Sequence, residues 1–486
     1  MNSSTDTIFA QSSAFGRSAI SLHRISGTSC LQRLNHLLKT VQKTSENEWI
    51  PGTQLKLSHG QTRYAFVIDD NNQVIDDCLI TYFASPMSYT GEETLELSCH
   101  GNPLITTKLH SLLRKHGCRD ALPGEFTQRA FLNGKLDLTR AEAIDQLIHA
   151  ESDAGLTLAR NASSGAINKF SHNVRNRLVS VMSYFEAHID FAEDEIGNYS
   201  ASTQTNELKS ICTELIQLRD SYNSGLKLRD GQKVVLVGEP NAGKSSLYNS
   251  LLGQERAIVT DIPGTTRDVV EDKLRINGQD FVLLDTAGIR TTSDTVERIG
   301  VTRTISSALT ADILCYLIDP SNFNTDSFEN ELHAALARLQ SDLKLATKPA
   351  EVIVFTKSDL WNQEIKACVS TASASISGQG LSSASCSSQL ENNKQLTDVL
   401  TGLREKLLNA GLGNEVPTLI SKRQQDKTDA AVQTLTEAIS LIEKDDYPEK
   451  IASLLIATTQ LLTEVIGEVG NEDVLANIFA NFCIGK

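Results

Sequence analysis

The sequence predicts a multidomain chain that combines α+β, all-α and α/β parts. Its 486 residues correspond to about three domains at a typical size of about 150 residues each. Segments with helical periodicity and few breakers lie on both sides of a segment in which buried strand runs alternate with helices. The simplest interpretation is an all-α domain interrupted by an inserted α/β domain, although two separate helical domains would give the same pattern.

The first region, residues 1–120, has the pattern of an α+β domain. Short runs rich in β-branched and aromatic residues are separated by Gly, Pro and Asn. The runs predict strands at 20–25, 64–69, 77–84 and 94–100.

The second region, residues 121–225, and the last, residues 391–486, are predicted to form the helical domain. From Leu138 to Asp220 there are few breakers, and apolar side chains recur at steps of three and four residues, so they share one helix face. These side chains are Val174, Leu178, Val181, Met182, Phe185 and Ile189. We interpret the face as core packing and not as a cofactor site.

The third region, residues 226–390, is predicted to be an α/β domain with a mostly parallel sheet. Buried runs at 233–238, 280–285, 313–319 and 351–357 alternate with helical segments, which is typical of βαβ units. Residues 369–388 are rich in serine, which predicts a flexible loop.

Composition excludes several classes of protein. Lys and Arg number 45 and Asp and Glu number 60, giving a net charge of −15, which argues against a strongly basic wrapper of nucleic acid. The nine cysteines are scattered and form no C-x-x-C pair, so neither a disulfide framework nor a zinc cluster is indicated. The sequence has neither the pattern of a signal peptide nor an apolar run that could span a bilayer, so we expect a cytoplasmic protein without a membrane segment.

Residues 238–245, GEPNAGKS, match the phosphate-binding pattern G-x-x-x-x-G-K-[ST]. The match lies between a predicted strand and a predicted helix, where backbone N–H groups can close around phosphates. Lys244 is expected to reach the β and γ oxygens, and the Ser245 hydroxyl to ligate Mg²⁺.

Two further motifs extend the predicted nucleotide site, and the second of them favours guanine. Asp285-Thr286-Ala287-Gly288 ends a predicted strand, which places a carboxylate near the magnesium and a glycine N–H near the γ-phosphate. Thr356-Lys357-Ser358-Asp359 follows another strand, and the Asp359 carboxylate can accept hydrogen bonds from the guanine N1–H and 2-amino groups. GTP proteins carry Asn where this chain has Thr356, and a hydroxyl cannot replace both groups of an amide. We therefore expect weaker nucleotide affinity with unchanged base choice.

Other nucleotide loops are less sharply defined by the sequence. The third guanine-side loop is placed near Ala374-Ser375-Ile376. Residues 257–268, AIVTDIPGTTRD, have the character of a switch loop that can close over Mg²⁺ and phosphates. Ile289 follows Gly288 where Ras-like proteins place a water-orienting Gln, so another group must orient the water.

Motifs from both ends of the chain carry a family resemblance. The relevant segments are GEPNAGKSSL, TDIPGTTRD, DTAGIR, VERIG and the C-terminal FCIGK, together with HRISG, SYTGEETLELSCHG and PGEFTQRAFLNGKLDLTRAEAID in the N-terminal half. With these the chain resembles the MnmE (TrmE) family of tRNA modification GTPases over nearly its whole length.

This resemblance implies an N-terminal folate-binding and dimerisation domain, a helical domain and an inserted Ras-like P-loop G domain. It implies a homodimer that joins the FAD- and NADH-dependent partner MnmG in a heterotetramer. That complex adds an aminomethyl or carboxymethylaminomethyl group to C5 of the wobble uridine, position 34, of certain tRNAs. Formyl- or methylene-tetrahydrofolate supplies the one-carbon unit, and K⁺ stimulates GTP hydrolysis.

The resemblance also assigns residues. The K⁺ ligands of the family correspond to Asn241, Thr260, Ile262 and Thr265, and the Mg²⁺ ligands to Ser245 and Thr266. The two catalytic residues are Glu297, which corresponds to the glutamate that orients the attacking water, and Lys244. The GTP contacts further include Ala242, Gly243, Ser246, Asp261, Pro263 and Gly264, with Asp285–Gly288 and Thr356–Asp359. Arg24, Glu96, Lys135 and Lys486 correspond to folate contacts, and Cys483 to the C-terminal cysteine of the family.

Two alternatives stay open from the sequence. The G motifs also suit a regulatory GTPase of the ribosome-assembly type, although that reading leaves the terminal signatures unexplained. Thr356 also permits a folate-binding module whose GTPase is vestigial. Because the chain is acidic, we expect weak, salt-sensitive binding of tRNA by this chain alone, with MnmG supplying basic surface.

Overall fold

A computed structural model describes the chain as two compact units. One comprises residues 1–148, 161–215 and 423–486, and the other residues 149–160 and 216–422. The residues described are 6–150, 152–190, 201–255, 271–276, 279–284, 311–343, 349–378, 381–386, 394–409, 417–444, 446–468, 475, 478–480 and 482–485.

The N-terminal part of the first unit is built on an eight-stranded sheet of order β4-β3-β5-β6-β7-β2-β1-β8. All neighbouring pairs are antiparallel except β1 with β8. The strands are β1 (Thr7–Gln11), β2 (Ser18–Ser26), β3 (Leu38–Lys43), β4 (Trp49–Gln54), β5 (Thr62–Ile68), β6 (Val74–Phe83), β7 (Thr94–Gly101) and β8 (Cys118–Asp120). The four strands predicted in this region are confirmed as β2, β5, β6 and β7, and the predicted runs 64–69 and 77–84 each end one residue past the observed strand.

One face of this sheet is buried. In β6, Cys78, Ile80 and Tyr82 are buried while Leu79 between them is exposed, as the two-residue repeat of a strand requires. Two helices and a 3₁₀ turn cover the buried face. They are α1 (Cys30–Leu34), η1 (Asn35–Leu37) and α2 (Pro103–Lys115). The Asn102 side chain accepts a hydrogen bond from the backbone N–H of Leu104 and so caps α2.

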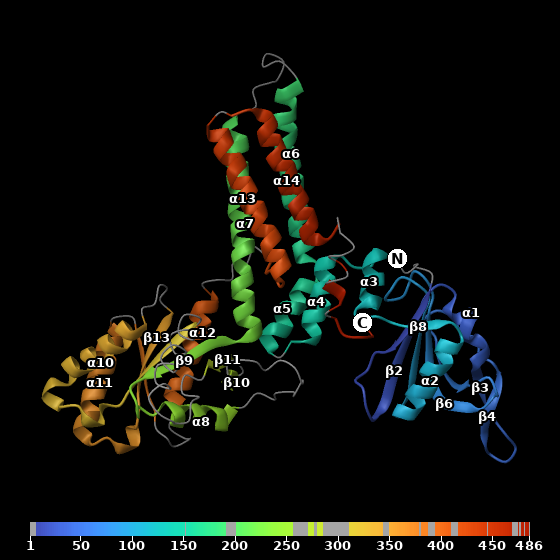
Figure 1. The fold of residues 1–486 in the computed structure, drawn as a ribbon, viewed down its shortest axis with the longest axis horizontal. Coiled ribbons are helices and arrows are strands. Elements are labelled where there is room, and N and C mark those ends of the chain that lie inside the picture. Colours follow the sequence, from blue (N-terminus) through green and yellow to red (C-terminus); the bar gives the residue numbers. More distant parts are fainter. Residues whose placement is uncertain are drawn as a thin grey trace, which may run out of the picture. The chain divides into compact units, whose positions relative to one another are not determined.

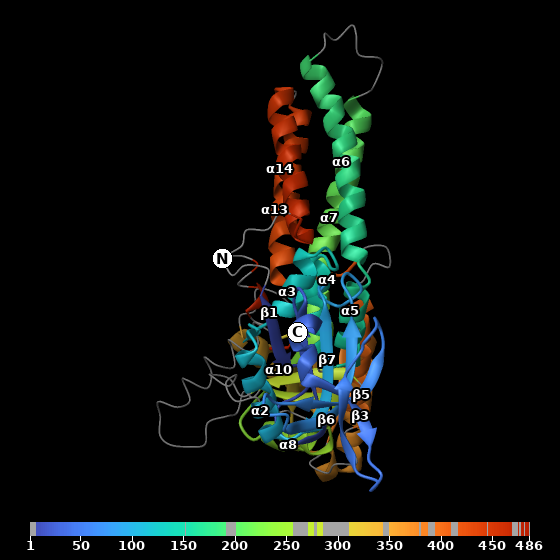
Figure 2. The ribbon, with the colours of Figure 1, turned by 90° about the vertical axis from the view of Figure 1, so that its right-hand side faces the viewer.

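The rest of the first unit is helical. Its helices are α3 (Glu125–Leu132), α4 (Leu138–Ile148), α6 (Ala166–Asp190), the first half of α7 (Ala201–Asp230), α13 (Lys422–Glu443) and α14 (Pro448–Ile466). Figures 1 and 2 show α6, α7, α13 and α14 running side by side. Val174, Leu178, Val181 and Phe185 of α6 are buried, which confirms their interpretation as core.

Helices from the two ends of the helical region pack together. Cys212 Sγ on α7 lies 3.6 Å from Thr436 Oγ1 on α13. The buried Glu142 carboxylate on α4 accepts hydrogen bonds from Arg423 and Gln424 on α13. These contacts bring helices from the two sequence segments together in one compact unit.

The second unit contains a six-stranded sheet of order β10-β11-β9-β12-β13-β14. Only β10 is antiparallel to its neighbour, so the prediction of a mostly parallel sheet is confirmed. The strands are β9 (Gln232–Gly238), β10 (Glu271–Ile276), β11 (Gln279–Leu284), β12 (Ile313–Ile318), β13 (Ala350–Phe355) and β14 (Ser382–Ser385).

Helices cover both faces of this sheet. They are α8 (Lys244–Glu255), α10 (Phe328–Leu343), α11 (Gln363–Gly378) and α12 (Lys394–Asn409), with short 3₁₀ turns η3 (Pro320–Asn322), η4 (Thr325–Ser327) and η5 (Ser358–Leu360). Along β9, Val234 and Leu236 join a core with α8 and α12, whereas Val235 and Val237 join a core with α10. Residues 153–160, which begin α5 (Asp153–Ser163), also belong to this unit.

The structure corrects two predictions in this unit. Within the predicted flexible loop, residues 369–378 instead belong to α11, where Val369, Ala372 and Ile376 are buried at helical spacing, and residues 382–385 form β14. The boundary at residue 390 also falls too early, since Leu396 and Leu400 of α12 are buried in the core of the six-stranded sheet. Serine content alone misled the prediction.

No helix in the described ranges combines the length and the apolar character that crossing a bilayer requires.

Candidate functional site

The predicted phosphate loop connects β9 to α8. Two positions have positive φ, Asn241 at 63° and Gly243 at 90°, a backbone conformation that favours glycine and asparagine. Gly238 is close-packed: a Cβ there would lie 2.7 Å from the backbone oxygen of Leu317. The close packing at Gly238 and the positive φ at Gly243 therefore explain why the motif has glycine at these two positions.

Lys244 folds back over this loop. Its Nζ donates hydrogen bonds of 2.8 Å to the backbone oxygens of Gly238 and Glu239. Burial lowers the pKa of Lys244. The ammonium group is thus held at the rim of the loop, where an incoming phosphate would offer it stronger, charged acceptors.

A pocket of about 210 Å³ joins the phosphate loop to the 356–359 motif. Gly243 and Ser246 line one part, and Thr356, Lys357 and Asp359 line another, although the two motifs are more than 100 residues apart in sequence. The pocket also contains Leu247, Leu360 and Cys386. Five of the residues predicted from sequence to contact GTP therefore line one pocket.

Thr356 lies beneath Gly243 and is buried. Its hydroxyl donates to the Ile318 backbone oxygen at 3.2 Å, and its own carbonyl accepts from Trp361 Nε1 at 3.0 Å. Lys357, at φ 59°, forms an ion pair of 2.6 Å with Asp319. The Thr356 hydroxyl thus donates its proton to β12. This supports the expectation that the motif binds nucleotide less tightly than a motif with asparagine at this position.

Thr356→Asn is expected to tighten GTP binding about fivefold, because one added hydrogen bond contributes about 1 kcal/mol. The amide can donate and accept together beside the phosphate loop. Fluorescence titration with a labelled GTP analogue measures the change. The matched control is Thr371→Asn on the exposed side of α11, which should bind as the wild type does. Equal or weaker binding by Thr356→Asn would contradict the argument.

The third guanine-side loop was placed wrongly. Ala374, Ser375 and Ile376 lie inside α11, and Ile376 is buried in a hydrophobic core. Cys386, directly after β14, lines the pocket instead, and its backbone N–H and carbonyl bond to Phe355 and Ser358. Burial raises the pKa of the Cys386 thiol to about 12, so the thiol is neutral. Because the strand β14 has the polar sequence SSAS, a search for apolar runs does not find it or the position that follows it.

A second cluster lies on the N-terminal sheet. Arg24 on β2 and Glu96 on β7 are cross-strand partners joined by an ion pair of 2.8 Å. The Arg24 guanidinium also lies over the ring of Tyr89, 5.2 Å from its centroid. A cation, a carboxylate and an aromatic ring thus meet in one place. Together they suit a planar ring system that carries hydrogen-bond donors and negative charge.

The C-terminal segment reaches this cluster. The backbone oxygen of Gly485 accepts from Ser12 Oγ at 2.9 Å and lies 3.5 Å from an Arg24 nitrogen. The backbone oxygen of the exposed Cys483 accepts a hydrogen bond from the N–H of Gly124, in the PGEFT motif. Lys135 binds the Pro86 backbone oxygen at 2.9 Å, so it contacts the loop that carries Tyr89. Two of the predicted folate contacts, Arg24 and Lys135, therefore touch this loop, and a third, Glu96, is paired with Arg24.

Some predicted residues lie outside the described part of the chain. They are Thr260, Asp261, Ile262, Pro263, Gly264, Thr265, Thr266, Asp285, Thr286, Ala287, Gly288, Glu297 and Lys486. Their assignments stay predictions.

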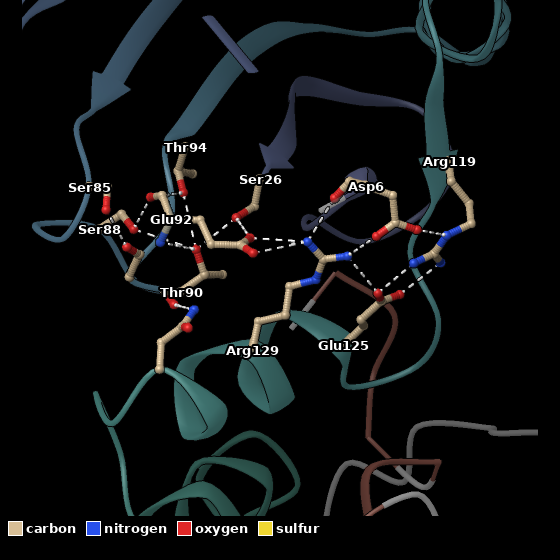
Figure 3. Close-up of polar contacts among 12 residues, drawn as sticks. Asp6, Ser26, Ser85, Ser88, Thr90, Glu92, Thr94, Arg119, Glu125 and Arg129 are labelled. Atoms are coloured by element: carbon tan, nitrogen blue, oxygen red, sulfur yellow. Dashed lines mark hydrogen bonds and ion pairs between the residues drawn. The ribbon is translucent and has the colours of Figure 1, made fainter. Parts of the chain in front are cut away.

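Sequence reasoning missed a partly buried ion network on the N-terminal domain (Figure 3). Arg129 bonds the carboxylates of Asp6, Glu92 and Glu125, and Arg119 bonds those of Asp6 and Glu125, over distances of 2.6–3.2 Å. Burial alone would raise the pKa of Glu125, but hydrogen bonds from Arg119, the Leu122 N–H and Arg129 outweigh it and lower the pKa. The Glu125–Arg129 spacing, i to i+4 on a helix, was the available signal.

The network fixes the loop beside the Arg24 cluster. Glu92 accepts from Ser26 at 2.8 Å, and Asn133 donates to the Thr90 backbone oxygen at 2.7 Å. The hydroxyl of Tyr89, directly before Thr90 in the chain, shares a hydrogen bond of 2.9 Å with the Thr127 hydroxyl. Thr127, Arg129 and Asn133 of the segment PGEFTQRAFLNG thus hold the loop that carries Tyr89.

Comparison with known proteins matches both parts of the chain to family models. Residues 7–135 match the model of the GTP-binding protein TrmE N-terminus, and residues 138–483 match the MnmE helical domain. The chain is 36% identical over 491 residues to the tRNA modification GTPase MnmE of Christiangramia forsetii, with 99% of each chain covered. It is 34% identical to that of Aquifex aeolicus over 486 residues, covering 99% of this chain and 100% of the relative. On sequence over its whole length, the chain belongs to the MnmE (TrmE) family of tRNA modification GTPases.

Proposed function

We propose that this chain is the GTP-hydrolysing subunit of a complex that modifies C5 of the wobble uridine, position 34, in certain tRNAs. In this proposal it acts as a homodimer in the cytoplasm, with MnmG carrying FAD and a tetrahydrofolate carrying the one-carbon unit. The observation that supports it most is the meeting of Arg24, Glu96 and Gly485, which brings residues from distant parts of the chain to one cluster.

The nucleotide half of the proposal rests on the pocket between Gly243 and Asp359. Lys244, held at the loop rim, would neutralise charge on the β- and γ-phosphates, and Asp359 would select guanine. The exposed Ser245 hydroxyl at the first turn of α8 suits Mg²⁺, with Thr266 as the second proposed protein ligand. The exposed Asn241, at φ 63°, suits K⁺, with Thr260, Ile262 and Thr265. Such a cation supplies positive charge that other GTPases take from an arginine.

The folate half rests on the Arg24 cluster. The Glu96 carboxylate can accept from the donor edge of a pterin ring, and the Tyr89 ring offers a flat apolar contact. Lys135 and Lys486 are the proposed partners of the glutamate tail. We propose no chemical role for Cys483 beyond its backbone bond to Gly124.

The decisive experiment measures GTP hydrolysis in KCl and in NaCl for the wild type and for Glu297→Ala. We expect faster hydrolysis in KCl, and we expect Glu297→Ala to lose turnover by 100-fold or more while it keeps its affinity for GTP, because a group that orients the water acts in the transition state. Glu329→Ala, on the described helix α10, is the matched control. Equal rates in both salts, or full activity of Glu297→Ala, would contradict these assignments.

A strain that lacks this protein tests the pathway. We expect its wobble uridines to lack the C5 group and the wild-type gene to restore it. Normal modification in that strain, together with co-purification of the protein with ribosomal subunits from wild-type cells, would favour the ribosome-assembly alternative instead.

A further inference from the structure

Two histidines and an aspartate from distant parts of the sequence meet on the N-terminal domain. They are His36 in η1, Asp70 in the turn between β5 and β6, and His116 directly after α2. One ligand atom of each lies within 4.8 Å of the others. The three residues span 80 positions of sequence, so no spacing motif could have revealed them.

The distances are close to those of a coordination shell. Two imidazoles bound to one tetrahedral zinc, with Zn–N of about 2.0–2.1 Å, have ring centroids about 5 Å apart. The rings of His36 and His116 are 4.7 Å apart, with an angle of 60° between their planes. His116 Nε2 lies 2.9 Å from Asp70 Oδ1, against about 3.3 Å between ligands in such a shell. Side-chain rotations that bring the His36 nitrogen from within 4.8 Å to about 3.3 Å of the other two ligand atoms would close the three groups on one ion.

The backbone holds each residue in place. Leu34 and Leu37, on both sides of His36, are buried in the core of the sheet. The Asp69 carboxylate accepts from the N–H groups of Asn71 and Gln73 at 2.8 Å each, which fixes the turn that carries Asp70. The backbone N–H of His116 bonds to the last turn of α2. The donors are thus presented by three anchored segments.

Asp70 is shared between two partners. Lys115 Nζ lies 2.5 Å from its second oxygen, and His116 contacts the first. The Arg33 guanidinium lies 3.5 Å from the backbone oxygen of His116 and takes no ligand atom. Lys115 is therefore a direct competitor of any cation for Asp70.

We propose that His36, Asp70 and His116 form a binding site for a divalent cation of the zinc class. Two imidazoles and one carboxylate suit Zn²⁺, Co²⁺ or Ni²⁺, whereas Mg²⁺ and Ca²⁺ prefer oxygen ligands alone. A water would complete the tetrahedron. The bound ion would tie η1, the β5–β6 turn and the end of α2 together, since its ligands come from all three.

The test uses the full-length chain stripped of metal with a chelator. Zn²⁺ affinity is measured by competition with a chromophoric chelator, and Co²⁺ reports geometry through the visible absorption of tetrahedral sites. We expect one site that His36→Gln and His116→Gln each weaken at least tenfold. Lys115→Met should bind Zn²⁺ more tightly by severalfold, because it removes the competitor for Asp70.

Controls separate this site from other donors. A second group of possible ligands, Asp76, Asp77 and His100, is tested with His100→Gln, and the exposed Cys483 is tested with Cys483→Ser. Both variants should keep the wild-type affinity. Circular dichroism and GTP hydrolysis, which the site does not serve, show whether each variant is folded. The proposal is overturned if His36→Gln and His116→Gln bind Zn²⁺ as the wild type does, if Lys115→Met binds it less tightly, or if the wild type shows no saturable binding.

Discussion

Replacing Arg129 with methionine is expected to lower the free energy of unfolding of the N-terminal domain by about 3–5 kcal/mol, the usual effect of removing one partner from a buried ion pair. Arg129 is buried and bonds three carboxylates. Arg119 would still pair with Asp6 and Glu125, so Glu92, with 12% of its side chain exposed, would lose its cation. Most of the loss should therefore come from one uncompensated carboxylate.

Urea unfolding followed by tryptophan fluorescence measures this loss. The chain has two tryptophans, so a Trp361→Phe background leaves Trp49, on β4, as the reporter of the N-terminal sheet. The matched control is Arg114→Met, whose ion pair with Asp120 is half exposed and should contribute less than about 1 kcal/mol. Adding Glu92→Gln to Arg129→Met should recover part of the stability. If Arg129→Met lowers the free energy of unfolding no more than Arg114→Met does, the prediction is wrong.

The second large effect is a loss of stability in acid that depends on His23. Its side chain is fully buried, with Nε2 3.0 Å from Ser21 Oγ and Nδ1 3.1 Å from His110 Nε2. Burial, with a smaller effect of the neighbouring His110, lowers the pKa of His23 from 6.5 to about 4. Above pH 6.5 the imidazole is neutral in both the folded and unfolded states and has no effect on stability.

Below pH 6.5 the unfolded chain binds a proton that the folded chain does not, so stability falls with falling pH until about pH 4. The whole window corresponds to roughly 3 kcal/mol. Carboxylates with lowered pKa values, such as Asp6 and Glu125, also lose stabilising contacts in acid. The contribution of His23 is therefore the difference between the wild-type pH profile and that of His23→Asn.

Urea unfolding at intervals between pH 7.5 and 4 gives both profiles. We expect His23→Asn to be less stable at neutral pH and to have a shallower pH dependence. His59→Asn, at an exposed histidine, should keep the wild-type slope. Parallel profiles for the wild type and His23→Asn would show that His23 does not titrate between the two states.

The parts of the fold that could be predicted from sequence are those with local causes. The phosphate loop has its glycines because Gly238 packs on Leu317 and Gly243 has φ 90°, so the pattern itself indicates the geometry. Strands such as β12, buried along its whole length, are continuous apolar runs. Both kinds of signal lie within a few residues of sequence, and both led to correct predictions.

The failures have non-local causes. The strand β14 is polar and short, and only its pairing with β13 makes it a strand. Its misreading as loop moved the third guanine-side loop ten residues away from Cys386. Arg129 pairs with Asp6 and Glu92, which lie 123 and 37 positions away in sequence. No periodicity could indicate partners at such separations. Long-range pairing, not propensity, decides both cases.

The packing of Phe479 and Phe482 has a consequence for synthesis on the ribosome. A Cβ on Gly124 would lie 2.6 Å from the backbone oxygen of Phe479, and both phenylalanines pack on Leu138 and Ala141 of α4. These partners are translated roughly 350 residues after Gly124, which takes about 20–70 s at typical bacterial speeds. A nascent chain must therefore hold α3 and α4 without their final cover while the nucleotide-binding part is made. Ribosome-bound intermediates of this length would be natural substrates for a chaperone.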